Sequence, residues 1–131
     1  MIFEAIQQEP HLLSILNLML ETKAENIRVI HTGETSTVSD WTVICEGTNF
    51  NHVRAIAMAI KQEMKQEDQY VDHTEGQDHN RWILLDYLDI VVHIMLPELR
   101  NYYKIEAFLE ENSQMTITEE EYQKLLPPKN Y

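Results

Sequence analysis

Paired carboxylates and a short glycine turn are the first residues whose types suggest a chemical role. Asp86 and Asp89 lie close together in the sequence, and nucleotidyl transfer needs two or three such carboxylates around a divalent metal. They lack the usual D-x-D spacing, and none of the three glycines precedes a serine that could help to hold a triphosphate. The turn Gly47-Thr48-Asn49 could bind an anion through free amides, as could any loop-to-helix junction. The residues themselves therefore argue against transferase catalysis.

The histidines and the single cysteine form no pattern typical of a metal or nucleophilic site. None of the six histidines has a short ligand spacing such as H-x3-H, by which zinc sites are often recognised. Cys45 lies in an apolar run and is expected to be a small buried side chain. One cysteine also excludes an intramolecular disulfide and fits a reducing compartment. We therefore expect no metal, no cofactor, no enzymatic activity and a cytoplasmic location.

Two neighbouring runs, residues 82–87 and 89–95, indicate a β-hairpin instead. Both are rich in β-branched and aromatic residues and are separated so narrowly that a two-residue turn at Tyr87-Leu88 is expected. Side chains alternate between the two faces of a strand. One face would therefore be purely aliphatic and would lie against the core, with Ile83, Leu85, Ile90, Val92 and Ile94.

The opposite face of this hairpin has the composition of a contact surface. With the expected turn, Asp86 pairs with Asp89 and Trp82 pairs with His93, and Met95 lies on the same face. A large aromatic residue beside carboxylates, an imidazole and a thioether is typical of protein interfaces. Each residue also has a structural interpretation. The tryptophan and the histidine could belong to the core, and the carboxylates could cap the turn.

A helix over residues 98–108 is expected after the hairpin, because Pro97 ends the second strand and an acidic first turn follows. Arg100 and Tyr103 would lie roughly on one side of it. The arginine could meet a partner or pair with a local carboxylate. The residues expected to contact a partner are therefore Trp82, Asp86, Asp89, His93, Met95, Arg100 and Tyr103.

The remaining pattern predicts a single α/β domain with a mixed sheet of about five strands flanked by helices. Apolar residues at helical spacing favour a helix over 11–21. A second helix, capped by Asn51, is expected to carry the apolar stripe Val53, Ile56, Ala57, Ile60 and Met64. The strands are expected at 27–31, 41–46 and 70–74, before the hairpin. The hairpin strands would be antiparallel, whereas the long helix suits a parallel crossover.

The tail, residues 111–131, is expected to be an acidic extension of a domain that occupies residues 1–110. Thr118 with Glu121 three residues later forms a capping box, which predicts a short helix over 119–126. That helix could dock on the domain through its apolar residues, or the segment could be partly disordered.

Size and charge limit the classes of partner. The chain has 131 residues and a formal net charge of −12, which argues against binding the backbone of DNA or RNA and is compatible with a basic protein. Acidity could also serve only solubility. No stretch approaches the ~20 apolar residues of a membrane helix, and the first residues lack the features of a signal or transit peptide.

Two blocks of the sequence resemble the ribosome silencing factors, also called the Iojap-like proteins. The first is EG-x5-W-x3-D-x2-D-x-V-VH-x-M-x4-R-x2-Y-x2-E, between Glu75 and Glu106; the second is DWTVICEGT, residues 40–48, followed by His52-Val53. The resemblance covers roughly residues 11–110. Leu88 departs from it, because the family usually has glycine in the hairpin turn.

The resemblance implies a fold related to that of nucleotidyltransferases and a function without turnover. Members bind a large-subunit ribosomal protein, L-fourteen, on the surface that faces the small subunit. They thereby block subunit joining and repress translation, and they can form homodimers. An active nucleotidyltransferase or a nucleotide-binding module is the alternative that the fold leaves open.

Overall fold

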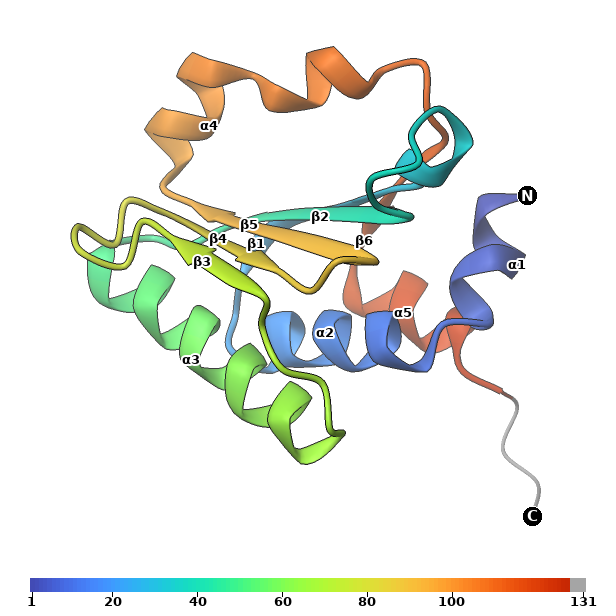
Figure 1. The fold of residues 1–131 in the computed structure, drawn as a ribbon, viewed down its shortest axis with the longest axis horizontal. Coiled ribbons are helices and arrows are strands. Elements are labelled where there is room, and N and C mark those ends of the chain that lie inside the picture. Colours follow the sequence, from blue (N-terminus) through green and yellow to red (C-terminus); the bar gives the residue numbers. More distant parts are fainter. Residues whose placement is uncertain (128–131) are drawn as a thin grey trace.

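Six strands form one mixed sheet that lies between two unequal layers (Figure 1). The computed structural model describes residues 1–127. The strand order is β3-β4-β5-β2-β1-β6, in which β2 and β5 are parallel and all other neighbours are antiparallel. The strands are β1 (Glu25–Ile30), β2 (Trp41–Glu46), β3 (His73–Glu75), β4 (Trp82–Asp86), β5 (Ile90–Met95) and β6 (Gln114–Ile117).

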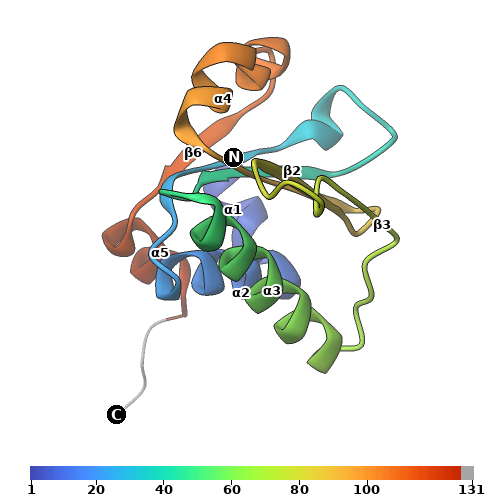
Figure 2. The same cartoon turned by 90° about the vertical axis from the view of Figure 1, so that its left-hand side faces the viewer.

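Helices cover the two faces of the sheet unequally (Figures 1 and 2). Four helices lie on one side: α1 (Ile2–Gln7), α2 (Pro10–Glu21), α3 (Phe50–Gln66) and α5 (Glu119–Leu125). On the other side α4 (Pro97–Tyr103) continues into the 3-10 helix η2 (Ile105–Leu109), while a short 3-10 helix, η1 (Thr32–Glu34), lies in the loop before β2. No helix within residues 1–127 has both the length and the apolar character needed to cross a membrane.

The main core lies between the sheet and the four-helix layer. The aliphatic face expected for the hairpin is part of it, since the alternate residues Ile83, Leu85, Val92 and Ile94 are buried there. Burying such side chains typically stabilises a fold by about 1.5–3 kcal/mol each. The expected single α/β domain with a mixed sheet is therefore confirmed.

The expected tail differs most from the structure. Residues 114–117 form β6, which pairs with β1 and makes a sixth strand where about five were expected. The helix start expected at Thr118 is confirmed, because the Thr118 hydroxyl caps the helix by accepting a hydrogen bond from the Glu121 N–H at 3.1 Å. The helix that follows buries Tyr122 and Leu125 in the main core. Residues 111–127 are thus part of the domain rather than an extension of it, and residues 128–131 lie outside the described residues.

Local capping explains where the longest helix begins. The side chain of Asn49, not the expected Asn51, caps α3 by accepting a hydrogen bond from the His52 N–H at 2.9 Å. Val53, one residue further on, begins the buried stripe that ends at Met64. The expected stripe is confirmed, and the cap lies two residues earlier because the backbone of Asn49 is extended, as an N-cap requires.

The hairpin register differs from the expected one by two residues. Asp86 pairs with Val91 and Trp82 pairs with Met95, so the turn residues are Leu88 and Asp89. The expected pairing was therefore wrong. The assignment of side chains to faces survives, because a shift of two residues returns each side chain to the same face of the pleat.

Leu88 has a backbone conformation that favours glycine. Its φ is +73°, and the Asp89 N–H donates to the Tyr87 carbonyl at 2.9 Å, which is the pattern of a strained γ-turn. We expect Leu88→Gly to raise the free energy of unfolding by about 0.5–1 kcal/mol, because the left-handed penalty exceeds the entropic cost of glycine. Urea denaturation measures this. Leu88→Ala is the control, since it removes the side chain without relieving the backbone, and an equal gain in that variant would contradict the explanation.

The helix expected over residues 98–108 is interrupted. α4 ends at Tyr103, and Lys104 follows in the left-handed conformation with φ +47°. The chain then turns into η2. The break brings Glu106 back towards Arg100, which an unbroken helix would have placed on a more distant turn.

Candidate partner-binding site

Half of one sheet face lacks a helical cover. Over β1, β2 and the end of β5, the side chains of Ile30, Ile44 and Met95 pack against α4 and η2. Over β4 and the rest of β5, the side chains that point away from the main core are partly exposed to solvent. We call this region the open face; it comprises Trp82, Leu84, Asp86, Val91 and His93, with His73 and Glu75 of the neighbouring edge strand β3.

Trp82 and His93 are joined by a direct hydrogen bond. The Trp82 Nε1–H donates to His93 Nδ1 at 3.0 Å, and the ring centroids are 5.9 Å apart. Because an indole N–H can only donate, Nδ1 must accept, and the imidazole is neutral with its proton on Nε2. The hydrogen bond fixes the orientation of the indole ring on the open face.

Burial lowers the pKa of His93 to about 4, while the Glu106 carboxylate opposes the shift. The folded state therefore binds this proton less readily than the unfolded state does. The stabilising effect of the neutral ring is complete above the ordinary histidine pKa of about 6.5 and is lost as the pH falls towards 4. In the same range, protonation of Nδ1 removes the acceptor that holds Trp82.

The variant His93→Gln is expected to remove this pH dependence. An amide oxygen can still accept from the indole but does not titrate. Between pH 7 and pH 4 the wild type should lose about 2–3 kcal/mol more stability than the variant. Urea denaturation of both proteins at pH 7, 5 and 4 gives this difference directly, because the titration of carboxylates is common to both proteins and cancels. Parallel curves would contradict a depressed histidine pKa.

Two tyrosines of α4 extend this group of aromatic rings. Tyr103 lies 5.2 Å from Trp82 between ring centroids, and Tyr102 meets Tyr103 edge-on at 4.9 Å. Tyr103 is 50% exposed and Tyr102 is 73% exposed. We refer to Trp82, His93, Tyr102 and Tyr103 as the aromatic cluster. The cluster lies where the open face meets α4, and the rings of its two tyrosines are accessible to a partner.

Arg100 holds α4 in place from beneath. Its side chain is buried, and its Nε donates to Glu106 Oε1 at 2.8 Å while Nη1 donates to Glu46 Oε2 at 3.2 Å. Nη1 also donates to the backbone carbonyl of Asn26, whose side-chain amide donates to the other oxygen of Glu46 at 3.0 Å. The guanidinium thus links α4 and η2 to β1 and β2, and so positions Tyr103.

The structure brings together only some of the predicted site residues. Trp82, His93 and Tyr103 are in mutual contact through Trp82. Met95 pairs with Trp82 across the hairpin but is fully buried, and the buried Arg100 is bound within the chain. These two lie beneath the surface that a partner could touch.

Asp86 and Asp89 lie at the other end of the hairpin. Asp86 Oδ1 accepts a hydrogen bond from the Leu88 N–H at 2.8 Å, which stabilises the turn. The backbone carbonyl of Asp89 accepts from the N–H groups of Asp40 and Trp41, both at 2.9 Å. In residues 1–127 no group of three or more His, Cys, Asp or Glu side chains could hold a metal ion. The implied relation to nucleotidyltransferases stays a prediction.

Several residues around Trp82 were given no role from the sequence, although Glu75 and Gly76 begin the first block of the family resemblance. A hollow of about 400 Å³ beside Trp82 is lined also by Glu75, Gly76 and Leu84. Gly76 has φ +85°, and a Cβ atom there would lie 1.8 Å from the Trp82 carbonyl oxygen, so glycine is required for the close approach. Strand alternation was the signal for Leu84. Glu46 lies in the second block of the family resemblance, residues 40–48, but its pairing with Arg100 could not be foreseen from the sequence.

Comparison with known proteins identifies the family. Residues 5–130 match the family model described as "Ribosomal silencing factor during starvation". The ribosomal silencing factor of Bacillus subtilis is 36% identical over 86 residues, which are 66% of this chain and 73% of that protein.

A mouse protein and a bacterial crystal structure are also similar. The mouse protein, named "Mitochondrial assembly of ribosomal large subunit protein 1", is 31% identical over 96 residues, covering 70% of this chain and 42% of that protein. A crystal structure of a protein from Chromobacterium violaceum superposes with a TM-score of 0.72 at 27% identity, covering 75% of this chain and 83% of that one. Because the family match spans nearly the whole sequence and the fold agrees, this chain belongs to the ribosomal silencing factor family.

Proposed function

We propose that this chain represses translation by binding the large ribosomal subunit through the ribosomal protein L-fourteen. The bound protein would then occupy space that the small subunit needs for joining. The family membership supports a silencing role, and the name of the mouse relative refers to the large subunit. Steric occlusion needs no turnover, so no catalytic group is invoked, and the action takes place in the cytoplasm.

The aromatic cluster on the open face is the observation that carries this proposal. Aromatic side chains fixed by hydrogen bonds and packing lose little entropy on binding and often act as interface anchors. Trp82 would be the central anchor, with Tyr103 beside it and His93 holding its ring. Arg100 and Met95 would support these residues from beneath.

Charge on and around the open face favours a basic partner. Glu75 and Asp86 lie on it, Asp89 is exposed at the hairpin turn, and the whole chain carries a net charge of −12. Opposite charges steer association and raise the on-rate, an effect that salt screens. Away from the ribosome the same face could pair with a second copy of the chain.

Sedimentation with purified ribosomal subunits tests the proposal. The protein is expected to travel with large subunits and not with small subunits, and to release them as the salt concentration rises. Purified L-fourteen should compete for the protein when added in excess. Equal sedimentation with both subunits, or no competition by L-fourteen, would overturn the assignment of the partner.

A further inference from the structure

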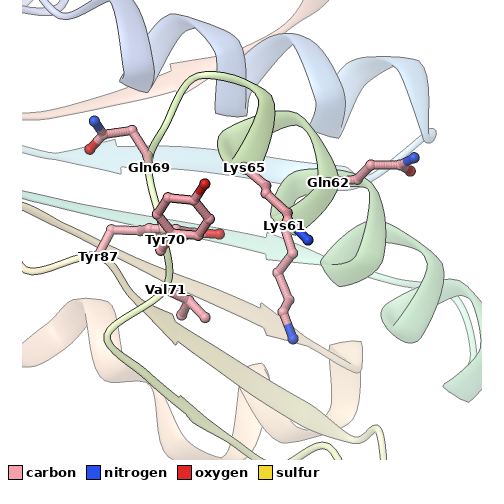
Figure 3. A pocket seen from close by; sticks show the side chains of 7 residues that line it. All are labelled: Lys61, Gln62, Lys65, Gln69, Tyr70, Val71 and Tyr87. Carbon is pink, nitrogen blue, oxygen red and sulfur yellow. The ribbon is translucent and has the colours of Figure 1, made fainter.

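A second hollow, of about 420 Å³, lies on the helical side of the sheet (Figure 3). One wall of the hollow is the C-terminal half of α3, and the opposite wall is the segment that leads from α3 into β3. Tyr87, from the end of the hairpin, closes it. This hollow is separate from the open face, which lies on the opposite side of the sheet.

The hollow is positively charged in an otherwise acidic protein. Lys61 and Lys65 stand one helical turn apart and both line it. None of the residues that line it within the described chain is acidic, and neither lysine belongs to an ion pair among residues 1–127. Lys61 also lines an adjoining hollow with Arg54. Like charges one helical turn apart repel each other, and a bound anion would relieve that repulsion.

Apart from the two lysines, the lining consists of two amides, Gln62 and Gln69, and of three apolar or aromatic side chains. Tyr70 is 63% exposed, and its ring lies over the hollow beside Val71 and Tyr87 (Figure 3). Burial raises the pKa of Tyr87 to about 12, so its hydroxyl stays protonated and can donate a hydrogen bond. An exposed ring of this kind offers a stacking surface to a planar ligand.

We propose that this hollow binds a nucleoside phosphate. The base would stack on Tyr70 over the apolar floor, and the phosphate groups would meet Lys61 and Lys65. The volume lies within the range of about 300–1,000 Å³ that is usual for small-molecule sites. A long polyanion would use the lysines but not the aromatic and apolar side chains, so the lining favours a compact ligand with both an aromatic and an anionic part. The proposal does not depend on ribosome binding.

Titration of the full-length, ¹⁵N-labelled protein with ADP and with GDP tests this directly. Saturable chemical-shift changes are expected at the amides of residues 61–71 and 87. Adenosine lacks the anion and pyrophosphate lacks the base. Each should bind at least roughly tenfold more weakly than ADP. A single-stranded RNA oligonucleotide serves as the polyanion probe.

Matched variants assign the contacts. Lys61→Gln with Lys65→Gln should weaken nucleotide binding roughly tenfold or more, and Tyr70→Ala should weaken it roughly tenfold. Lys23→Gln with Lys104→Gln makes the same change in net charge away from the hollow and should leave binding within about twofold. All these side chains are at least partly exposed, and thermal melting verifies that each variant is folded.

Four results would overturn the proposal. The first is the absence of saturable chemical-shift changes at these amides with about 10 mM nucleotide, a concentration well above the dissociation constants of specific sites. The second is an equal loss of binding in the two double-lysine variants, which would indicate only a general charge effect. The third is binding of pyrophosphate as tight as that of ADP, with no effect of Tyr70→Ala. The fourth is binding of RNA at this hollow without binding of nucleotide.

Discussion

Replacing Arg100 by methionine is expected to lower the free energy of unfolding by about 3–5 kcal/mol, the range typical of removing one partner from a buried ion pair. The loss has a specific cause. The guanidinium pairs with Glu46 and Glu106 and binds the Asn26 carbonyl, and methionine would leave two largely buried carboxylates without their cation. Urea denaturation at neutral pH measures the change.

Lys124→Met provides a matched control for this prediction. Lys124 also contacts two carboxylates, those of Glu120 and Glu121, both at 3.7 Å. These pairs are at the surface, so the same exchange of a cation for methionine should change stability by no more than ~1 kcal/mol. If both variants lost the same free energy of unfolding, burial would not be the reason for the stabilising effect of the Arg100 network.

The second large effect is expected for binding to the large subunit. Trp82→Ala should weaken it by about 2 kcal/mol or more, equivalent to roughly thirtyfold, because central aromatic anchors dominate interface energies. Tyr103→Ala should weaken it less, because Tyr103 has the smaller ring and lies beside the proposed central anchor rather than at its centre. Sedimentation or surface-immobilised large subunits give the affinities.

Folding must be separated from binding in these variants. Trp82 is partly buried and packs against the small cluster under α4, so its replacement also costs stability. Tyr103→Ala removes an exposed ring and should leave the melting temperature nearly unchanged. Tyr70→Ala is the matched control, because Tyr70 is also a largely exposed tyrosine and lies on the other side of the sheet. Unchanged affinity for Tyr103→Ala and Trp82→Ala, both folded, would rule out the aromatic cluster as the contact.

The parts of the fold that follow from local patterns could be predicted. The alternation of aliphatic residues from Ile83 to Ile94 correctly assigned the hairpin faces, because a period of two depends only on the strand itself. The stripe along α3 was equally clear, since five buried residues recur at helical spacing. The Thr118 capping box located the start of α5.

The parts of the fold that depend on contacts between residues distant in the sequence could not be predicted. β6 is only four residues long, too short to give a clear strand signal, and it forms because the edge of β1 is available to pair with it. The hairpin register was wrong because Leu88 occupies a left-handed turn position that usually takes glycine. The break in the helix at Lys104 likewise depends on the pairing of Glu106 with Arg100 across that turn.

The candidate site shows the same division. The sequence placed Trp82 and His93 on one face, and the structure adds that they are hydrogen-bonded and in contact with Tyr103 through Trp82. Arg100 and Met95 belong to the same motif but are buried. A motif residue can therefore support a surface without being part of it, and only the three-dimensional packing separates the two roles.

The most direct test of the central claim is a measurement of subunit joining by light scattering. Large subunits are first mixed with the wild-type protein, and small subunits are then added under conditions that normally give the joined ribosome. The account predicts that the wild type lowers the joined fraction in proportion to its occupancy of large subunits, and that folded Trp82→Ala does so only at much higher concentration. Normal joining of large subunits that are saturated with the wild-type protein would contradict it.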